Sequence, residues 1–336
     1  MSALPISARL LLSYLLVAVL PLAGLAAFYL ASFEASLRET VLANMSTIAD
    51  KKAEQIDSYI AERLTDAQQL SQRESIRNGI TTLGQAFRSS GQNAPAYQST
   101  ARQLGDYFKT SNSAEDFYDL LLMDTAGNVV FSLMQEPDLG TNLRHGPYRD
   151  TQLAKGFALA MQTLQTHLTR FASYAPSGNR PAAFLSAPVL ENGVVIGVLA
   201  LQLDVSKLES VTADRTGLGR TGETVLAQKD GGEAFYTVPL RHVQDAAYHY
   251  RVPLQKAALP MQKALAGNHG RGVIRDYAGI EGVAAWRYLP ALGWGMVVKI
   301  DADEALAPAA QLRRVTYLAL ALFLMLSGVE IGRAHV

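Results

Sequence analysis

The chain lacks cysteine, and it lacks net charge, because 30 Lys and Arg balance 30 Asp and Glu among its 336 residues. Without cysteine it has no disulfides, no thiolate metal ligands and no cysteine nucleophile. A balanced charge attracts no polyanion, and no basic cluster is interleaved with aromatic residues. We therefore expect no nucleic-acid partner. The absence of cysteine also suits an oxidising compartment.

Formal charge is also missing from residues 10–33, LLLSYLLVAVLPLAGLAAFYLASF. At about 1.5 Å per residue this run would reach about 36 Å as a helix, enough to cross a hydrocarbon core of roughly 30 Å. The alternative is a cleaved signal peptide, whose apolar core is usually about 7–15 residues long. The length favours an uncleaved transmembrane helix. Arg9 precedes it without an acidic residue, which places residues 1–9 in the cytoplasm and the following block outside.

Glycine and proline are absent between Phe33 and Asn78. Apolar residues recur there mostly every three or four positions, with charged residues between them, which predicts one long amphipathic helix over 34–78. Its apolar stripe has two candidate partners: the sheet domains of its own chain, or the same helix of a second copy in a homodimer. Different parts of the stripe could serve each, so both remain open.

A second apolar run covers residues 315–329. It is about 15 residues long, short of the roughly 20 that a spanning helix needs. The last seven residues, EIGRAHV, differ from it in composition and resemble the translation of a common sequencing-adapter oligonucleotide. We expect 315–329 to be a truncated second transmembrane helix, 330–336 to be an artefactual tail, and a cytoplasmic output domain to be missing.

Between the apolar runs, strand-like patterns occur in two blocks, 79–210 and 211–308. Each block is expected to hold two strands, an excursion of loop and helix, and three further strands. The expected strands are 117–124, 129–133, 170–174, 182–190 and 194–203 in the first block, and 223–228, 233–238, 272–277, 282–288 and 294–300 in the second. Asn192-Gly193 is a strong hairpin signal. The fold class is α+β, with two antiparallel five-stranded modules in tandem.

Several segments resemble a double Cache sensory domain over roughly residues 33–308. They are YDLLLMDTAGNVVFS at 118–132, DLGTNLRHGPYRD at 138–150, GVLALQLDVSKL at 197–208, GLGRTGETVLAQKDG at 217–231 and AAWRYLPALGWGMVVKID at 284–301. The resemblance implies two PAS-like Cache modules. The membrane-distal one, 79–210, would bind a small molecule, and the membrane-proximal one, 211–308, would pass the change to the second membrane helix.

The resemblance also implies a ligand site. Amino-acid-binding members carry an Arg-x-Trp-Tyr segment and an aspartate on the last distal strand, whereas this chain has no tryptophan at 144–148 and has Gln202 for the aspartate. An amide cannot pair with an ammonium as a carboxylate does, which puts amino-acid binding in doubt, although Asp204 is two residues away. The predicted ligand-binding residues are Arg144, His145, Tyr148, Arg149, Tyr174, Gln202 and Asp204.

Each of these residues has a structural alternative. Arg144 and Arg149 would either grip an anionic ligand or be solvated loop arginines. Tyr148 and Tyr174 would either wall the pocket or pack on the sheet. Gln202, the sole polar residue of an apolar strand, needs buried partners that a ligand or the loop above could supply.

Motifs of catalysis are not found in the sequence. GLGRTG at 217–222 matches GxGxxG, but it follows the expected connector helix 205–211 and enters a strand, so we interpret it as a linker rather than a dinucleotide site. His145 has no partner histidine. We expect no catalytic residues, no cofactor and no metal site.

Together these patterns predict the ligand-sensing region of a multi-pass receptor in a bacterial inner membrane, with residues 34–308 periplasmic or extracellular. Its partners would be a small molecule, the lipid bilayer and a second copy bound through the 34–78 helix. Relatives suggest a histidine kinase as the missing output, with a chemotaxis receptor or a diguanylate cyclase as alternatives. A membrane-anchored enzyme or an adhesion module is the alternative of another class. A ligand-sized cavity in the distal module would separate a sensor from an adhesion module.

Overall fold

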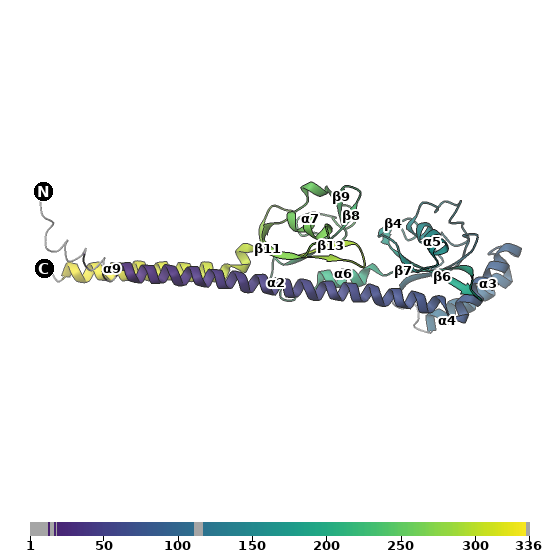
Figure 1. The fold of residues 1–336 in the computed structure, drawn as a ribbon, viewed down its shortest axis with the longest axis horizontal. Helices are drawn as coiled ribbons and strands as arrows, with labels where there is room; N and C mark the ends of the chain where they lie inside the picture. The colour runs from purple at the N-terminus through teal and green to yellow at the C-terminus, as the bar shows by residue number, and fades with distance from the viewer. Residues whose placement is uncertain (1–12, 14–16, 18, 111–116, 334–336) are drawn as a thin grey trace.

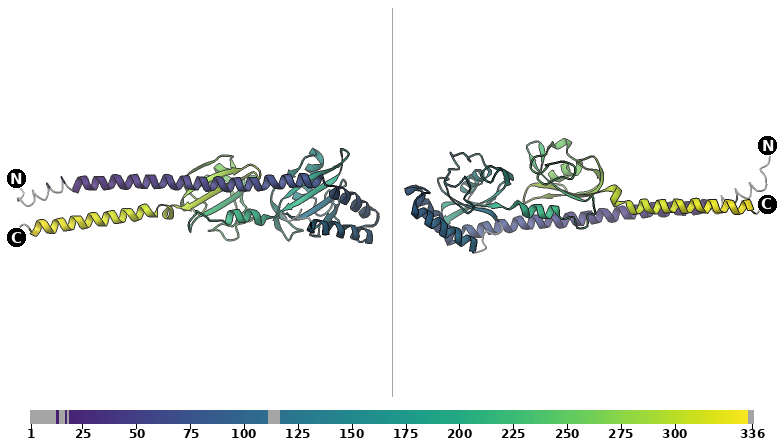
Figure 2. Two further views of the ribbon diagram at one scale, coloured as in Figure 1. Left: turned by 90° about the horizontal axis from the view of Figure 1, so that it is seen from below. Right: turned by 180° about the vertical axis from the view of Figure 1, so that it is seen from behind.

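The computed structural model describes residues 13, 17, 19–110 and 117–333, and it is a rod built along one helix (Figure 1). Helix α2 (Leu20–Ser71) runs along the rod, and two sheet-containing modules lie one after the other on the same flank of it. Helix α9 (Ala307–Arg333) returns beside the first part of α2 (Figure 2). The described chain therefore leaves from and comes back to the same end of the rod.

The remaining elements fall into a distal module (α3 to β7, residues 74–203), far from α9, and a proximal module (β8 to β13, residues 223–301). The other helices are α3 (Glu74–Ser90), α4 (Pro95–Thr110), α5 (Gln152–Thr163), α6 (Val205–Ala213), the 3-10 turn η2 (Leu254–Lys256), α7 (Leu259–Leu265) and α8 (Ala302–Ala305). The distal strands are β1 (Phe117–Asp124), β2 (Val129–Ser132), β3 (His167–Leu168), β4 (Ala172–Tyr174), β5 (Arg180–Ala182), β6 (Phe184–Glu191) and β7 (Val194–Leu203). The proximal strands are β8 (Glu223–Asp230), β9 (Glu233–Tyr236), β10 (Arg251–Pro253), β11 (Gly270–Arg275), β12 (Glu281–Leu289) and β13 (Trp294–Asp301).

The distal sheet is antiparallel in the order β2-β1-β7-β6-β3. Its β6–β7 hairpin turns at Asn192 and Gly193, whose φ angles of 50° and 81° confirm the predicted turn. The predicted strand at 170–174 is wrong as a member of this sheet. The fifth strand is β3, and β4 instead pairs with β5 in a separate ribbon. The chain leaves the sheet because Phe171 is drawn into the contact between the modules.

The proximal sheet has six strands, in the order β10-β9-β8-β13-β12-β11, where the sequence predicts five. The extra strand, β10, is three residues long and pairs with β9 at the edge. It contains Val252 and ends on Pro253, a residue that strands tolerate at an edge. So short a strand, ending on a proline, leaves no alternating pattern in the sequence.

The apolar stripe of α2 lies on the two sheets of its own chain. Met45, Ala49, Ile56, Ile60 and Leu70 are each at most 3% exposed and join one core with both sheets. In the part of α2 beyond the apolar segment, the large hydrophobic residues that the structure describes are buried or half-buried. The intrachain alternative therefore accounts for the stripe.

The predicted helix over 34–78 is in fact two helices. Helix α2 ends at Ser71, and α3 begins at Glu74 after Arg73 takes an extended conformation, with φ −68° and ψ 141°. The turn allows α3 to bury Ile76 and Ile80 against the distal sheet. A straight continuation of α2 would carry these two side chains past the end of the sheet. Tertiary packing overrides a sequence that has no glycine or proline to mark the break.

Two helices in the described part of the chain are long and apolar enough to cross a membrane: α2, through its first part, and residues 307–326 of α9. Their apolar side chains point outward, with Phe28 70% and Leu318 71% exposed. Much of the predicted span 10–33 before Leu20 lies outside the described residues, as do the last three residues of the predicted tail 330–336. Helix α9 continues through the predicted 315–329 segment to Arg333.

The joint between the modules is formed by Arg170 and Phe171. The Phe171 ring meets the Trp294 ring edge-on, with centroids 5.2 Å apart, and the Phe171 carbonyl accepts a hydrogen bond of 3.1 Å from Gln228 Nε2. Arg170 Nη2 donates to the Lys229 carbonyl and to Asp230 Oδ1, at 2.9 and 3.0 Å. Motion of the chain before β4 is thereby coupled to β8 and β13.

Lys52, 5% exposed in the middle of α2, offers a test of how the modules are held. Its Nζ donates to the carbonyls of Val211 and Asp214 at the end of α6, the helix that connects the modules. We expect Lys52→Met to leave these carbonyls unpaired and to lower the free energy of unfolding by about 1–3 kcal/mol. Denaturant unfolding measures the loss. Lys51→Met, on the exposed face of the same helix, is the control, and equal stability of both variants would contradict this role.

Candidate functional site

Seven side chains form a polar cluster inside the distal module, behind the edge of its sheet. Two of them, Tyr174 and Gln202, are predicted ligand residues, and both are buried, at 1% and 3% exposure. β4 supplies the tyrosine and β7 the glutamine. The distal acidic cluster, as we name it, consists of Asp119, Ser132, Glu136, Asp138, Tyr174, Ser177 and Gln202.

Asp138 is the most enclosed acid of the distal acidic cluster, at 0% exposure. Its Oδ2 accepts a hydrogen bond of 2.5 Å from the Tyr174 hydroxyl, while its Oδ1 accepts none from any described residue. Burial and the charge of Glu136 raise the pKa of Asp138, against the lowering effect of the Tyr174 bond and of the backbone N–H groups of Asp138 and Leu139. A buried carboxylate oxygen without a donor is costly in free energy. Asp138 Oδ1 is therefore the atom of the cluster that a hydrogen-bond donor on a ligand would stabilise most.

Asp119 lies on β1, directly across the sheet from Gln202 on β7. Its Oδ1 accepts from the Met134 backbone N–H at 2.9 Å and its Oδ2 from Ser132 Oγ at 2.8 Å. Burial, together with the neighbouring charge of Asp138, raises the pKa of Asp119 to about 7, against the lowering effect of these hydrogen bonds. Asp119 therefore changes its charge near neutral pH.

Glu136 connects the cluster to its rim. Its two oxygens accept from Tyr118 Oη at 2.8 Å and from Ser177 Oγ at 2.6 Å. Ser177 in turn accepts from Gln202 Nε2 at 3.2 Å, so the predicted amide is satisfied within the protein. Arg180 stands over the Tyr118 ring at 4.5 Å on the exposed side. Three carboxylates thus share the site, and none of the ion pairs found among the described residues joins them to a cation.

A cleft of about 660 Å³ lies beside this cluster, between α4 and the chain from β2 to Leu139, and Asp138 is not among its lining residues. Ser132 and Glu136 belong both to its wall and to the cluster, and Arg102, Asp106 and Lys109 of α4 also line it. Its volume is that of a small-molecule site. Buried apolar side chains, among them Phe157 of α5 and Phe184 of β6, fill the neighbouring space between the sheet and α5.

The other predicted residues lie outside the cluster. Arg144, His145 and Arg149 are exposed, and the Arg144 guanidinium stacks over the Phe157 ring at 5.2 Å. Tyr148 is half-buried against the apolar core beneath α5. Asp204, two residues from Gln202, does not lie on β7. It caps α6, and its Oδ1 accepts from the Ser206 backbone N–H at 2.9 Å. The structure brings together only Tyr174 and Gln202 of the seven.

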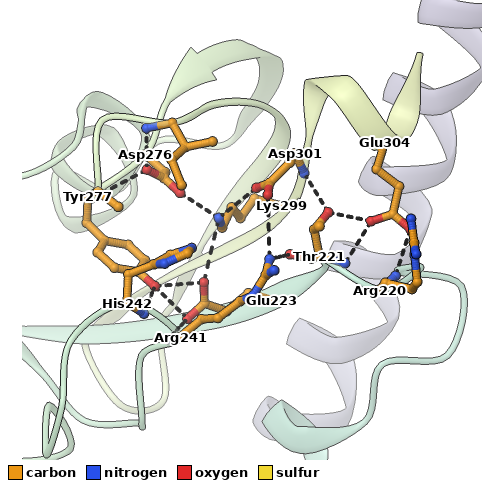
Figure 3. A network of polar contacts seen from close by, with 12 residues as sticks. Arg220, Thr221, Glu223, Arg241, His242, Asp276, Tyr277, Lys299, Asp301 and Glu304 are labelled. Atoms are coloured by element: carbon orange, nitrogen blue, oxygen red, sulfur yellow. Dashed lines mark hydrogen bonds and ion pairs between the residues drawn. The ribbon is translucent and has the colours of Figure 1, made fainter. Parts of the chain in front are cut away.

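A second cluster, in the proximal module, is built around Lys299 of β13 (Figure 3). The lysine is 1% exposed, and its Nζ lies 2.5 Å from Asp276, 3.1 Å from Asp301 and 3.7 Å from Glu223. Burial would lower the pKa of Lys299, but the hydrogen bond and charge of Asp276, with help from the other two acids, raise it overall. Unlike the distal acidic cluster, this one contains its own cation.

The proximal cluster continues into the glycine-rich segment 217–222 and α8 (Figure 3). Thr221 Oγ1 accepts from the Asp301 backbone N–H at 3.1 Å and donates to Glu304 Oε2 at 2.5 Å. Glu304 also accepts from the backbone N–H groups of Arg220 and Thr221. The bond from the Thr221 hydroxyl, together with these two backbone bonds, lowers the pKa of Glu304 to about 2. The segment that matches GxGxxG thus binds a carboxylate of α8, immediately before α9.

Residues 33–309 match the family model described as Cache domain. The chain belongs to the Cache domain family. The family and the α+β fold class predicted from the sequence are therefore confirmed. Cache domains of this kind are sensory domains of histidine kinases and chemoreceptors. Comparison with curated proteins found no match.

Three solved structures illustrate the likeness of the fold. The sensor domain of the V. cholerae histidine kinase DctB is 16% identical, with a TM-score of 0.53 over 78% of this chain and 98% of that one. The ligand-binding domain of the Pseudomonas aeruginosa amino acid chemoreceptor PctB, in complex with L-Arg, is 14% identical, with a TM-score of 0.50 over 80% and 98%. That of the Pseudomonas fluorescens chemoreceptor CtaA, in complex with L-leucine, is 15% identical, with a TM-score of 0.51 over 81% and 99%.

Among the residues that the structure describes, no group of three His, Asp or Glu side chains is placed to hold a metal ion. His145 lies exposed on its loop, and its backbone N–H donates to Asn142 Oδ1 at 3.1 Å.

Sequence reasoning missed the charged residues of both clusters. Asp119 lies in FYDLLLMD and Lys299 in WGMVVKID, each next to a run of apolar residues within a strand, a signal similar to the one that singled out Gln202. Asp138 and Glu136 stand in a polar loop, where nothing local distinguishes a buried acid from a solvated one.

Asp119→Asn tests the burial of the distal carboxylate. An asparagine can accept the Leu120 and Met134 N–H bonds at Oδ1 and donate from Nδ2 to Ser132 Oγ in place of the third bond, but it cannot ionise. Because the folded-state pKa is raised from 3.8 to about 7, the folded form binds an extra proton between these pH values, and stability falls as pH rises through that window. We expect the wild type to lose up to about 4 kcal/mol relative to Asp119→Asn between pH 4 and pH 7. Parallel stability curves for the two proteins would contradict it.

Lys299→Met tests the proximal cluster. Removing the cation leaves Asp276, Asp301 and Glu223 facing one another with little access to water, so we expect a loss of about 3–5 kcal/mol in the free energy of unfolding. Urea titration measures this loss. Lys263→Met, whose ammonium stands over the Trp286 ring in the same module, is the control. A loss no larger than that of the control would show that the acids are not held by Lys299.

Proposed function

We propose that the chain is the sensory region of a transmembrane receptor, and that its distal module binds a small amine-bearing molecule at the distal acidic cluster. The observation that carries the proposal is Asp138, a fully buried carboxylate with one oxygen held by Tyr174 and the other without a donor among the described residues. Membership of a family of sensory domains supports the general role.

The charge of the site selects the ligand class. Glu136, Asp138 and, above about pH 7, Asp119 bring negative charge together without a buried cation. An ammonium group supplies both the positive charge and up to three N–H donors, and charge-assisted bonds of this kind are roughly twice as strong as neutral ones. An anionic ligand would add repulsion instead.

Amino acids are amines, which makes them the first class to test. PctB and CtaA have been solved with L-Arg and L-leucine bound. The sequence puts amino-acid binding in doubt because position 202 holds an amide. Asp119 lies opposite Gln202 across the sheet and supplies a carboxylate at the same level of the module. In the cleft beside the cluster, Arg102 and Lys109 would suit the carboxylate of an amino acid.

Binding would be transmitted along contacts that the fold already contains. Asp138 holds Tyr174, and Phe171, three residues earlier, packs on Trp294 at the start of β13. The same strand ends in Lys299 and Asp301, which lead through Thr221 to Glu304 of α8. A ligand shifts α9 in this scheme only if it binds one arrangement of these contacts more tightly than another.

The surroundings of the module follow from the same proposal. We place residues 34–308 outside the inner membrane of a bacterium, with α2 and α9 as spans of a multi-pass protein in the bilayer. The output domain we propose is a histidine kinase, with a chemotaxis receptor or a diguanylate cyclase as alternatives. A homodimer through residues 34–71 would have to use the polar face of α2, because its apolar stripe is covered.

Asp138→Asn tests the site. The full chain in lipid nanodiscs is screened by thermal shift against L-amino acids, putrescine and succinate, since a ligand of the folded state raises the melting temperature. We expect one or more amines, and not succinate, to stabilise the wild type, and Asp138→Asn to weaken binding at least tenfold, about 1.4 kcal/mol. Asp150→Asn is the control, because it removes an exposed carboxylate from the same connection between β2 and α5.

Two results would contradict this assignment. One is stabilisation by succinate alone, which an acid-only cluster does not explain. The other is equal amine affinity in the wild type and Asp138→Asn. Arg144→Ala in the same series tests the arginine predicted from the sequence, and unchanged affinity would remove Arg144 from the site.

A further inference from the structure

A second cleft, of about 580 Å³, lies at the joint between the two modules. Its walls come from α5 and the chain around β4 on the distal side, and from α6, β8, β9 and the chain before β10 on the proximal side. It is separate from the distal acidic cluster, with which it shares no lining residue. Its volume falls in the range of small-molecule sites.

The inter-module cleft is basic. Lys155, Arg170 and Arg251 line it against two carboxylates, Glu209 and Asp230. Asp230 is already paired, because Arg170 Nη2 lies 3.0 Å from its Oδ1 and Arg251 Nη1 lies 2.5 Å from its Oδ2. Lys155 takes part in none of the ion pairs formed by described residues. An anion entering the cleft would therefore meet an unpaired ammonium and two guanidinium groups that retain further N–H donors.

Gln228 supplies an independent sign of a ligand. It lines the cleft at 4% exposure, and its Nε2 donates to the Phe171 carbonyl, but its Oε1 accepts no hydrogen bond from any described residue. Buried amide oxygens are nearly always bonded, so this acceptor calls for an N–H or O–H donor. Phe171 and Tyr248 lie beside it, with ring centroids 6.5 Å apart. Phe171 is 2% exposed, whereas Tyr248 is half-buried and offers an aromatic surface.

We propose that the inter-module cleft binds a small aromatic carboxylate that also carries a hydroxyl or amino donor. The carboxylate would bind Lys155 and Arg170, the donor would bond to Gln228 Oε1, and the ring would lie against Tyr248. Because Arg170 also bonds to Asp230 and Gln228 to the Phe171 carbonyl, such a ligand would bind at the contact through which the modules are joined. This site is separate from the distal acidic cluster.

The test uses three matched probes on the full chain in nanodiscs: 4-hydroxybenzoate, benzoate without the donor, and 4-hydroxybenzyl alcohol without the carboxylate. Calorimetry measures affinity. Fluorescence reports the site, because both tryptophans of the chain, Trp286 and Trp294, are in the proximal module and only Trp294 touches Phe171. We expect 4-hydroxybenzoate to bind at least tenfold more tightly than benzoate and to change the fluorescence, and the alcohol not to bind.

Variants locate the binding. Lys155→Met and Arg170→Met should each weaken 4-hydroxybenzoate at least tenfold, while Lys51→Met on the exposed face of α2 should not. Gln228→Met should reduce 4-hydroxybenzoate to the affinity of benzoate and leave benzoate itself unchanged, which a mere loss of folding would not do. Asp138→Asn should leave the affinity unchanged, so this site and the distal one stand or fall separately.

Three results would overturn the proposal: no saturable binding of any probe at millimolar concentration, equal affinity for 4-hydroxybenzoate and benzoate, or loss of binding in Asp138→Asn with normal binding in Lys155→Met.

Discussion

Both sheets of this receptor domain pack on one face of α2, and this shared apolar contact is the constraint on which the rest of the structure depends. The helix has 52 residues, about 78 Å at 1.5 Å per residue, so it reaches from its apolar segment to the distal module without interruption. Packed apolar surfaces have few arrangements between which they can move. Changes in either module are therefore directed along the rod, toward the place where α9 lies beside α2.

The two polar clusters differ in charge, and the difference separates their roles. In the proximal module, Lys299 compensates three acids, and the network joins β13 to α8. Such a network holds a geometry and has no need of a partner. In the distal module, no ion pair among the described residues joins the acids to a cation, and Asp138 Oδ1 accepts no hydrogen bond from them. The distal acidic cluster is therefore the one that a cationic partner would compensate.

Much of the fold was accessible from the sequence, because its elements follow from local patterns. The period of the apolar residues identifies α2, short apolar runs identify β1 and β7, and Asn192-Gly193 identifies the turn of the β6–β7 hairpin. The errors lie where tertiary contacts decide. The chain turns at Arg73 to cover the sheet, and Phe171 leaves the sheet to meet Trp294.

The site was less accessible for the same reason. Tyr174 and Gln202 stand out locally, but the acids beside them become a cluster only through the pairing of β1 with β7 and the fold of the 134–138 segment. The arginines at 144 and 149 were predicted from the resemblance of their loop to the family's ligand-binding segment. The structure leaves their side chains exposed, since Asn142 turns this loop away by accepting from the backbone N–H groups of Arg144 and His145.

Since the chain has no native cysteine, a spin label can be placed at any two positions without background. Lys51→Cys on α2 and Gln311→Cys on α9 would report the movement of α9 along α2 in nanodiscs by pulsed electron resonance. With a saturating amine that stabilises the distal module, the account predicts a shift of the mean distance by about 1–2 Å, which Asp138→Asn abolishes. An unchanged distance at saturation would show that the distal module does not signal along the rod.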